Sequence, residues 1–266
     1  MNESVFVKKT MDFSKKFCCR FIKKIYAFDE LASTNLTAKE LALHGSEEGT
    51  IVIAQTQRQG RGRFDRTWQS PKGGVYLSII LRPRTPIEKT SLLPFVAALA
   101  VTKAVLSYGI PARIKWPNDV LVHGKKIAGI LLESETSGIT VPYVVVGIGI
   151  NLNTPLSKLD VDIRKRSTSL RKEHGASIKY YEFLDTLFQH FDRCYQLFSA
   201  GNFEQIIDEW KQHSDTLGKT IRVQTTKDMV QGTAIAIDQS GFLLIKTKEG
   251  NLIRVVSGDC IDFDDL

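Results

Sequence analysis

The chain has 266 residues, of which 42% are hydrophobic and 24% charged, an ordinary globular composition that excludes disorder as the general state. Its length predicts one large domain with a small one appended, and no uninterrupted apolar run is long enough to span a membrane. The net charge of +7 is concentrated in residues 1–25, which hold seven basic and two acidic side chains. We therefore expect a basic N-terminal arm, residues 1–20, and a nearly balanced body, with neither nucleic acid nor a membrane as partner.

The cysteines and histidines form neither a metal-binding pattern nor a disulfide framework. Cys18, Cys19, Cys194 and Cys260 show no C-x-x-C spacing, and the five histidines are scattered. A reducing compartment fits this usage, and we expect the protein in the cytoplasm. An organelle-targeting peptide at the basic arm is the alternative, although the arm carries acidic residues and has no long apolar run.

Strand and helix patterns alternate through the first part of the chain. Strands are predicted at 21–28, 49–55, 74–81 and 141–151, with two more around a turn between 112 and 133. Helices are predicted from 33–35 to about 44 and over 91–108. A Gly/Arg-rich loop at 57–70 separates the second and third strands.

The chain ends in a small β-rich module. A polar surface connection at 155–178 precedes two predicted helices, at 180–199 and 203–213. After Leu217 and Gly218, short β-rich runs alternate with turns, at 220–224, 232–237, 242–247 and 251–257. We therefore place a domain boundary between 216 and 217, with residues 217–266 as a separate all-β unit.

Three common catalytic patterns fail in this sequence. GIG at 147–149 follows a strand, but Leu152 stands where a dinucleotide-binding loop needs its third glycine. GKT at 218–220 resembles the end of a P-loop, but His213 stands where the first glycine should be. The sequence has no G-x-S-x-G elbow, so Ser/His hydrolysis has no support.

The first motif with chemical content is GRGRFDRTW, residues 60–68, here named the arginine loop. Arg61, Arg63 and Arg66 put fork-shaped donors on one short segment, and its glycines allow close backbone approach. Such a loop suits a triphosphate, with Trp68 as a flat cover for a ring. Because like charges repel, we expect the loop to be flexible until a ligand neutralises it. An exposed or RNA-contacting arginine segment is the alternative.

The second motif is KWPND followed by GKKIAGI. Pro117 fixes a bend after a strand, so Asn118 and Asp119 point from a rigid turn. Lys126 lies on a strand near Gly129, whose small size leaves room for a ligand. A lysine there supplies a compact positive charge for a phosphate oxygen and for charge that develops during group transfer. A β-hairpin with surface lysines is the alternative.

Two further segments combine small polar residues with glycines. Ser33, Thr34 and Asn35 stand between a strand and a helix start, where a single capping residue suffices. GIGIN at 147–151 places two glycines in a β-branched strand, which indicates that a ligand or another backbone lies close to the sheet. Helix capping and a plain central strand are the alternatives.

In this order, STN (33–35), GRGR…W (60–68), KWPND…GKKIAGIL (115–131) and GIGINLN (147–153) resemble the biotin–protein ligase family, over residues 25–260. The resemblance implies an α/β (α+β) fold over 21–216, a mixed β-sheet with flanking helices similar to class II aminoacyl-tRNA synthetases. A small C-terminal SH3-like β-barrel over 217–266 would follow it. The family joins biotin to ATP as biotinyl-5′-adenylate, releasing pyrophosphate, with Mg²⁺. It then transfers biotin to one lysine of a biotin carboxyl carrier protein, of acetyl-CoA carboxylase or a related carboxylase.

Matched position by position, the resemblance implies three sets of site residues. The biotin-binding set is Ser33, Thr34, Asn35, Gln57, Arg61, Gly62, Arg63, Lys126 and Gly129. The nucleotide-binding set is Arg61, Arg63, Arg66, Trp68, Asn118, Lys126 and Asn151. The catalytic set is Lys126, Arg63 and Asp119. The two cations would offset the repulsion between biotin's carboxylate and the α-phosphate, and the aspartate would help to deprotonate the carrier lysine. No residue is assigned as a metal ligand.

The resemblance leaves departures and alternatives. Phe64 and Asp65 stand where family loops often have a basic or small residue and a glycine. Some members begin with a winged-helix repressor domain. About 20 residues precede the first predicted strand, so we expect the short form, without DNA-binding or repressor function. Self-association is common in the family, so a homodimer is compatible with the resemblance. A lipoate–protein ligase or octanoyltransferase is the alternative enzyme, and an RNA-binding module is the alternative outside enzymes.

Overall fold

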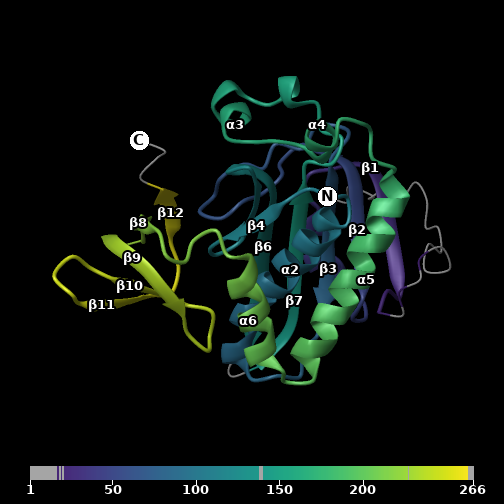
Figure 1. Ribbon diagram of the computed structural model, residues 1–266. Helices are drawn as coiled ribbons and strands as arrows, with labels where there is room; N and C mark the ends of the chain where they lie inside the picture. Colours follow the sequence, from purple (N-terminus) through teal and green to yellow (C-terminus); the bar gives the residue numbers. More distant parts are fainter. Residues whose placement is uncertain (1–16, 18, 20, 138–139, 227, 263–266) are drawn as a thin grey trace.

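A computed structural model describes residues 17, 19, 21–137, 140–226 and 228–262 (Figure 1). The predicted basic arm therefore lies outside the described residues, except for Phe17 and Cys19. The main sheet has seven strands in the order β1-β2-β3-β7-β6-β5-β4. They are β1 Lys24–Leu31, β2 Thr50–Gln57, β3 Val75–Leu81, β4 Ala112–Lys115, β5 Asp119–Val122, β6 Lys125–Ser137 and β7 Thr140–Ile150. Only β1 and β2 are parallel neighbours, so the sheet is mixed, as the resemblance implied.

The alternation of side chains along β7 gives the sheet two distinct faces. Val144 and Val146 point into the larger hydrophobic cluster, whereas Tyr143 and Val145 point into the smaller one. The same alternation places the glycines of β7 on the second face. A site beside these glycines therefore lies on the face of the smaller cluster.

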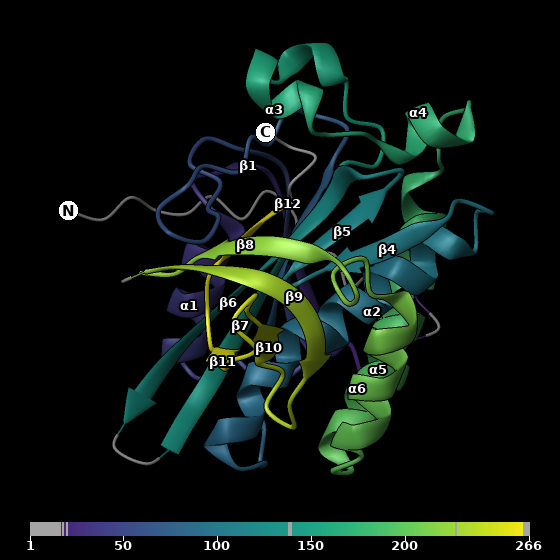
Figure 2. The same ribbon diagram turned by 60° about the vertical axis from the view of Figure 1, so that its left-hand side comes forward.

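Helices cover both faces unequally (Figure 2). The larger cluster packs under α2 Leu93–Leu106, α5 Tyr180–Ser199 and α6 Phe203–His213, which contact one another. On the other face α1 Thr34–Leu43 contacts β2, β3 and β7. Because α1 covers only part of that face, the remainder is available for a site.

The stretch Ile87–Leu106 is long and apolar enough to cross a membrane by length and composition, with a mean hydropathy of 1.5. It comprises the 3-10 helix η2 Ile87–Leu92 and α2, and Glu88 and Lys89 interrupt the apolar run. In the fold, 67% of this apolar stretch is buried inside the protein. Packing between the sheet and two other helices accounts for the apolar character of α2.

One expectation for the middle of the chain was wrong. The segment 112–133 forms three strands rather than two, because β5 and β6 are separated by a tight turn at His123 and Gly124. Both residues have positive φ, 50° and 73°, as hairpin turns of the primed types require. The polar connection at 155–178 contains three short helical segments, η3 Leu156–Lys158, α3 Val161–Lys165 and α4 Leu170–His174.

The C-terminal lobe, residues 217–262, is a five-stranded antiparallel sheet in the order β11-β10-β9-β8-β12. Its strands are β8 Thr220–Gln224, β9 Met229–Ile237, β10 Leu243–Lys246, β11 Leu252–Val255 and β12 Asp259–Asp262. The sequence predicted the first four and missed β12, which is short and carries an aspartate at each end. Among the described residues, β11 and β12 are the two ends of the sheet.

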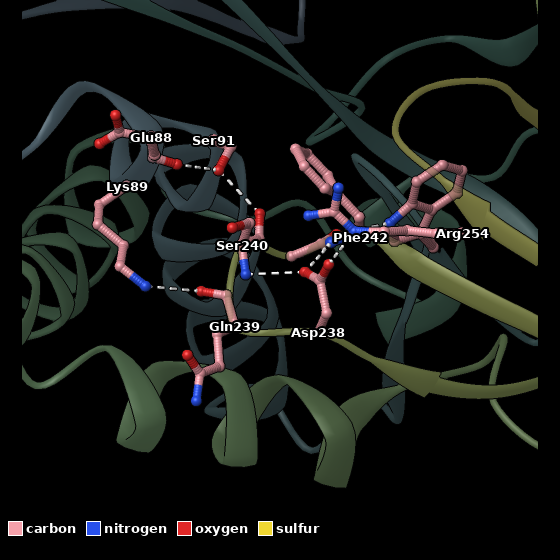
Figure 3. Close-up of polar contacts among 10 residues, drawn as sticks. Glu88, Lys89, Ser91, Asp238, Gln239, Ser240, Phe242 and Arg254 are labelled. Carbon is pink, nitrogen blue, oxygen red and sulfur yellow. Dashed lines mark hydrogen bonds and ion pairs between the residues drawn. The ribbon is translucent and has the colours of Figure 1, made fainter.

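A tight turn in the lobe docks it onto the domain that contains the main sheet (Figure 3). Asp238 accepts hydrogen bonds from the backbone N–H groups of Ser240 and Phe242, at 2.8 and 3.0 Å. Burial opposes ionisation of Asp238, but these bonds and Arg254 outweigh it and lower its pKa. Backbone carbonyl groups of this turn accept hydrogen bonds from side chains of η2. The Ser91 hydroxyl, for example, donates to the backbone carbonyl oxygen of Ser240 at 2.8 Å.

The same turn reaches the KWPND motif. Trp116 is 2% exposed and donates its indole N–H to the carbonyl oxygen of Gly241, at 3.0 Å. Its backbone N–H donates to Thr216 Oγ1 at 2.9 Å, and its bond to Pro117 is cis. The turn that carries Asn118 and Asp119 is thus held from the side of the C-terminal lobe.

Candidate active site

A pocket of about 160 Å³ lies on the α1 face of the main sheet. Of the residues predicted for the site, it is lined by Ser33, Thr34, Asn35, Gln57, Arg61, Gly62, Arg63, Arg66, Trp68, Asn118, Asp119, Lys126 and Gly129. The other lining residues are Thr67, Leu77, Ile130, Leu131, Gly147, Ile148, Gly149 and Asp259. All four sequence motifs therefore meet around one pocket.

One end of the pocket is neutral and polar, and it is built around the start of α1. Ser33 occupies the N-cap position without a side-chain capping bond. Instead, Gln57 Oε1 accepts from the backbone N–H of Thr34 at 2.8 Å, and its Nε2 donates to Ser70 Oγ at 2.9 Å. The helix thereby gains an acceptor for an otherwise unpaired N–H, and the Gln57 amide is held in one orientation.

Asn35 extends this network across the sheet. Its Oδ1 accepts from Ser78 Oγ at 2.5 Å, and its Nδ2 donates to Glu133 Oε2 at 2.7 Å. A Cβ at Gly147 would lie 2.1 Å from Asn35 Oδ1, so only glycine leaves room for this side chain. Neither Ser78 nor Glu133 was predicted from the sequence.

The wall of the pocket is a flat patch where two glycines face each other across β6 and β7. Gly129 pairs with Gly149 in the register of the two strands. The indole of Trp68 lies over them, because Cβ atoms at Gly129 and Gly149 would fall 3.1 and 2.6 Å from its ring. Lys126 Nζ is 5.4 Å from the ring centroid, within range of a cation–π interaction.

The other end of the pocket is strongly charged. Lys126 Nζ lies 2.7 Å from Asp119 Oδ1, and both side chains are partly exposed to the pocket. Asn118 is fixed from both sides, since its Nδ2 donates to the Ile130 carbonyl at 2.6 Å and its own carbonyl accepts from the Ile130 N–H at 2.9 Å. These bonds fix the turn against the strand that carries Lys126.

The arginine loop is a small hairpin. Its arms meet at a bridge between Arg61 and Thr67, and the backbone N–H of Arg66 donates to the Arg63 carbonyl at 3.2 Å. The two residues inside that turn, Phe64 and Asp65, both have positive φ, 54° and 55°. This conformation corresponds to a type I′ turn, the usual connection for two tightly paired arms.

The premise that the loop's charges are unneutralised was wrong, because each arginine contacts an acceptor of the protein. Arg61 Nη1 lies 2.9 Å from Glu133 Oε1, and Arg66 forms an ion pair with Asp259. Arg63 donates to Ser257 Oγ at 2.7 Å and to the Gly258 carbonyl at 3.1 Å. The C-terminal lobe therefore holds two of the three arginines.

Arg63 is the most enclosed of these cations. Burial lowers the pKa of its guanidinium, while the charges of Asp259 and Asp119 oppose that shift. An arginine stays protonated in proteins, so Arg63 presents a permanent positive charge that is partly shielded from water. Such a charge acts on an anion more strongly than an exposed one does.

Asn151 does not join the other predicted residues. It is 3% exposed at the end of β7 and outside the residues that line the pocket. Its backbone bonds to Ile127 and Leu170, which ties β7 to β6 and to the start of α4. The prediction of a nucleotide contact for Asn151 is thus not supported, and the residue fixes the end of the strand instead.

Family models match most of the chain. The model of the biotin/lipoate A/B protein ligase family matches residues 27–151. The model of the biotin protein ligase C-terminal domain matches residues 216–261, which include nearly all of the C-terminal lobe.

Individual relatives agree with the family models. The bifunctional ligase/repressor BirA of Bacillus subtilis is 37% identical over 87% of this chain and 71% of its own length. The biotin–[acetyl-CoA-carboxylase] ligase of Paracoccus denitrificans is 38% identical over 83% of this chain and 93% of its own. The structure of the Aquifex aeolicus biotin protein ligase in complex with biotin and ATP superposes with a TM-score of 0.78, at 29% identity, and covers 90% of this chain and 98% of that one. The chain therefore belongs to the biotin–protein ligase family.

Proposed function

We propose that this chain is an ATP-dependent biotin–[acetyl-CoA-carboxylase] ligase, which forms biotinyl-5′-adenylate and transfers biotin to a carrier lysine. The observation that supports this most directly is one pocket with a neutral polar end at Thr34, Asn35 and Gln57 and a cationic end at Arg63 and Lys126. Biotin has the matching shape, with a ureido ring at one end and a carboxylate at the other. The oriented amides suit the ring, and the cations suit the carboxylate beside a phosphate.

The first step brings two anions together, because biotin's carboxylate attacks the α-phosphate of ATP. Arg63 and Lys126 offset this repulsion and stabilise the charge on the phosphoryl oxygens, while the walls hold the reactants in line. Trp68 covers the glycine patch and suits the adenine or the adenylate. In the second step the amine of the carrier lysine attacks the acyl carbon and AMP leaves. Asp119 is the nearby carboxylate for the proton that this amine loses.

We propose that Mg²⁺ enters with the triphosphate. Within the part of the chain that the structure describes, no three His, Cys, Asp or Glu side chains cluster as a metal site. Mg²⁺ commonly binds one or two carboxylates together with substrate phosphates. Asp119 and Asp259 line the pocket and would suit it, and the ion would neutralise charge on the leaving pyrophosphate.

We also propose a carboxylase carrier as acceptor and the cytoplasm as compartment. The Paracoccus relative is named for acetyl-CoA carboxylase, which supports an acceptor of that class. Among the described residues, Cys19 and Cys194 form no disulfide, and burial raises the pKa of Cys194 to about 11, so it remains a thiol. These features suit a reducing compartment.

The arginines of the loop contact acceptors of the protein itself, which gives the RNA-binding alternative no support.

The proposed function predicts biotinyl-adenylate formation without a carrier. The purified protein, incubated with biotin, ATP and Mg²⁺, should release pyrophosphate, and addition of a biotin carrier domain should place biotin on its lysine. Lipoate in place of biotin serves as the control substrate. Turnover with lipoate but not with biotin would overturn the proposal in favour of a lipoate ligase.

Replacement of Lys126 by alanine should slow adenylate formation by roughly 10²–10³, the usual effect of removing one preorganised group that stabilises transition-state charge. Lys125→Ala is the matched control, because this neighbouring lysine is exposed and does not line the pocket. The rate of pyrophosphate release is measured at saturating concentrations of biotin and ATP. Equal rates in the two variants would remove Lys126 from the chemistry.

A further inference from the structure

Glu133 is a carboxylate behind the polar end of the pocket that the reaction described above does not use. It lies on β6 opposite Val145 of β7, on the α1 face of the sheet. Its side chain is only 16% exposed. Oε1 lies 2.9 Å from Arg61 Nη1, and Oε2 accepts from Asn35 Nδ2 at 2.7 Å. One partly buried carboxylate thus joins the arginine loop to the first turn of α1.

Glu133 on one side and Ser78 on the other fix the orientation of the Asn35 side-chain amide. An ionised carboxylate only accepts hydrogen bonds, so it requires the NH₂ group of Asn35 on its side. The opposite side holds the Ser78 hydroxyl, which donates to Asn35 Oδ1 at 2.5 Å. With both neighbours in place the amide has one orientation, and its second N–H is the group left for a ligand. Without the carboxylate, the Asn35 amide could adopt the flipped orientation as readily as the one observed.

The same carboxylate also fixes the arginine loop. Arg61 is 39% exposed in its side chain and sits at the bridge between the two arms of the hairpin. An exposed ion pair contributes little by itself, but the Glu133 end of this pair is partly buried and shared with a second donor. The position of the loop and the orientation of Asn35 therefore depend on the same side chain.

We propose that Glu133 is a positioning residue for biotin, acting through Asn35 and Arg61 without touching the reacting atoms. The inference rests on the proposed function, because it assigns Asn35 to the biotin end of the pocket. Loss of the carboxylate frees the amide and releases one arm of the loop from the sheet. Biotin binding is then weakened, while Arg63 and Arg66 keep their contacts with the C-terminal lobe.

The test compares Glu133→Gln with Glu135→Gln. Glu135 follows two residues later on the same strand, opposite Tyr143, whose hydroxyl donates to it at 2.6 Å, and it does not line the pocket. Glutamine keeps the size of the side chain but can no longer accept from both donors as a carboxylate does. Hydrogen bonds to charged groups are strong enough that the KM for biotin should rise about tenfold or more in Glu133→Gln. The KM for ATP should stay within about twofold, and Glu135→Gln should match the unmodified protein.

A double-mutant cycle separates positioning from a purely structural role. Asn35→Ala should raise the KM for biotin, and adding Glu133→Gln to it should raise the KM by a smaller factor than Glu133→Gln does alone, because part of the effect passes through Asn35. Equal losses for biotin and ATP, full additivity, or an unchanged KM would each overturn the proposal. If Glu133→Gln does not fold, Glu133→Asp keeps the charge on a shorter arm and should give a smaller shift, for biotin alone. Failure of the unmodified protein to make biotinyl-adenylate would instead overturn the proposed function.

Discussion

Asp65 carries a backbone cost in the arginine loop. Its φ of 55° and that of Phe64, 54°, are the left-handed values that a type I′ turn needs and that glycine adopts most readily. Asp65→Gly should relieve about 1 kcal/mol and slow the hydrogen exchange of the Gly62 and Arg66 amides, which bond across the turn, about fivefold after correction for intrinsic rates. Asp65→Ala is the control, since it removes the carboxylate but keeps the strained φ. Slower exchange in the alanine variant as well would mean that the charge, not the backbone, sets the stability of the turn.

Individual site residues differed in how well the sequence could predict them. Lys126 and Trp68 lie in short motifs whose residue types already suggest anion chemistry, and the structure places both at the pocket. Glu133 lies in an ordinary strand, 72 residues from Arg61, and Asp259 lies 193 residues from Arg66. Nothing local distinguishes such carboxylates, because their role depends on which distant cation the fold brings beside them.

At the scale of the element, β7 supports both ends of the pocket through two glycines on one face. A Cβ at Gly147 would meet Asn35, whereas one at Gly149 would meet the indole of Trp68. Gly147→Ala should therefore raise the KM for biotin more than that for ATP, and Gly149→Ala should do the opposite, each by about tenfold, as expected for a displaced binding group. Steady-state kinetics of both variants, with thermal unfolding as a check on folding, decide between them. The same loss pattern in both variants would mean that they only distort the strand.

The elements themselves were predictable in proportion to their length and pattern. The helices α5 and α6 have the predicted bounds, because a long amphipathic repeat is visible in the sequence. The four-residue strands β4 and β5 are too short to show such a pattern, and they form because they pair with each other and β5 also pairs with β6. Such short strands depend on pairing with their neighbours, so the sequence pattern predicted two strands in the segment 112–133 where the structure has three.

At the scale of the whole molecule, the pocket is completed by the C-terminal lobe. The composition shift after Gly218 indicated a separate β-rich unit, but not where it would sit. In the structure it contacts Trp116 at the start of the WPND turn, and its segment at Ser257 and Asp259 contacts the arginine loop. The lobe thus fixes two of the motifs that the catalytic domain supplies, although the sequences of these motifs do not predict any contact with it.

This arrangement predicts that the lobe protects the loop from proteolysis. Ser257→Ala combined with Asp259→Ala removes the side chains of the lobe that accept from Arg63 and Arg66, whereas the Gly258 carbonyl and the Asn118 side chain still accept from Arg63. Two lost hydrogen bonds to charged groups, one of them solvent-exposed, should favour the open loop by about 1–2 kcal/mol. Trypsin cleavage within the loop should then accelerate roughly five- to thirtyfold, because cleavage follows the population of the open state when opening is fast. Mass spectrometry of the fragments identifies the cut, and Asp208→Asn, which breaks an exposed pair with Lys211 on α6, is the control. Cleavage as slow as in the control would mean that the hairpin holds itself closed and that the lobe contacts follow its position rather than set it.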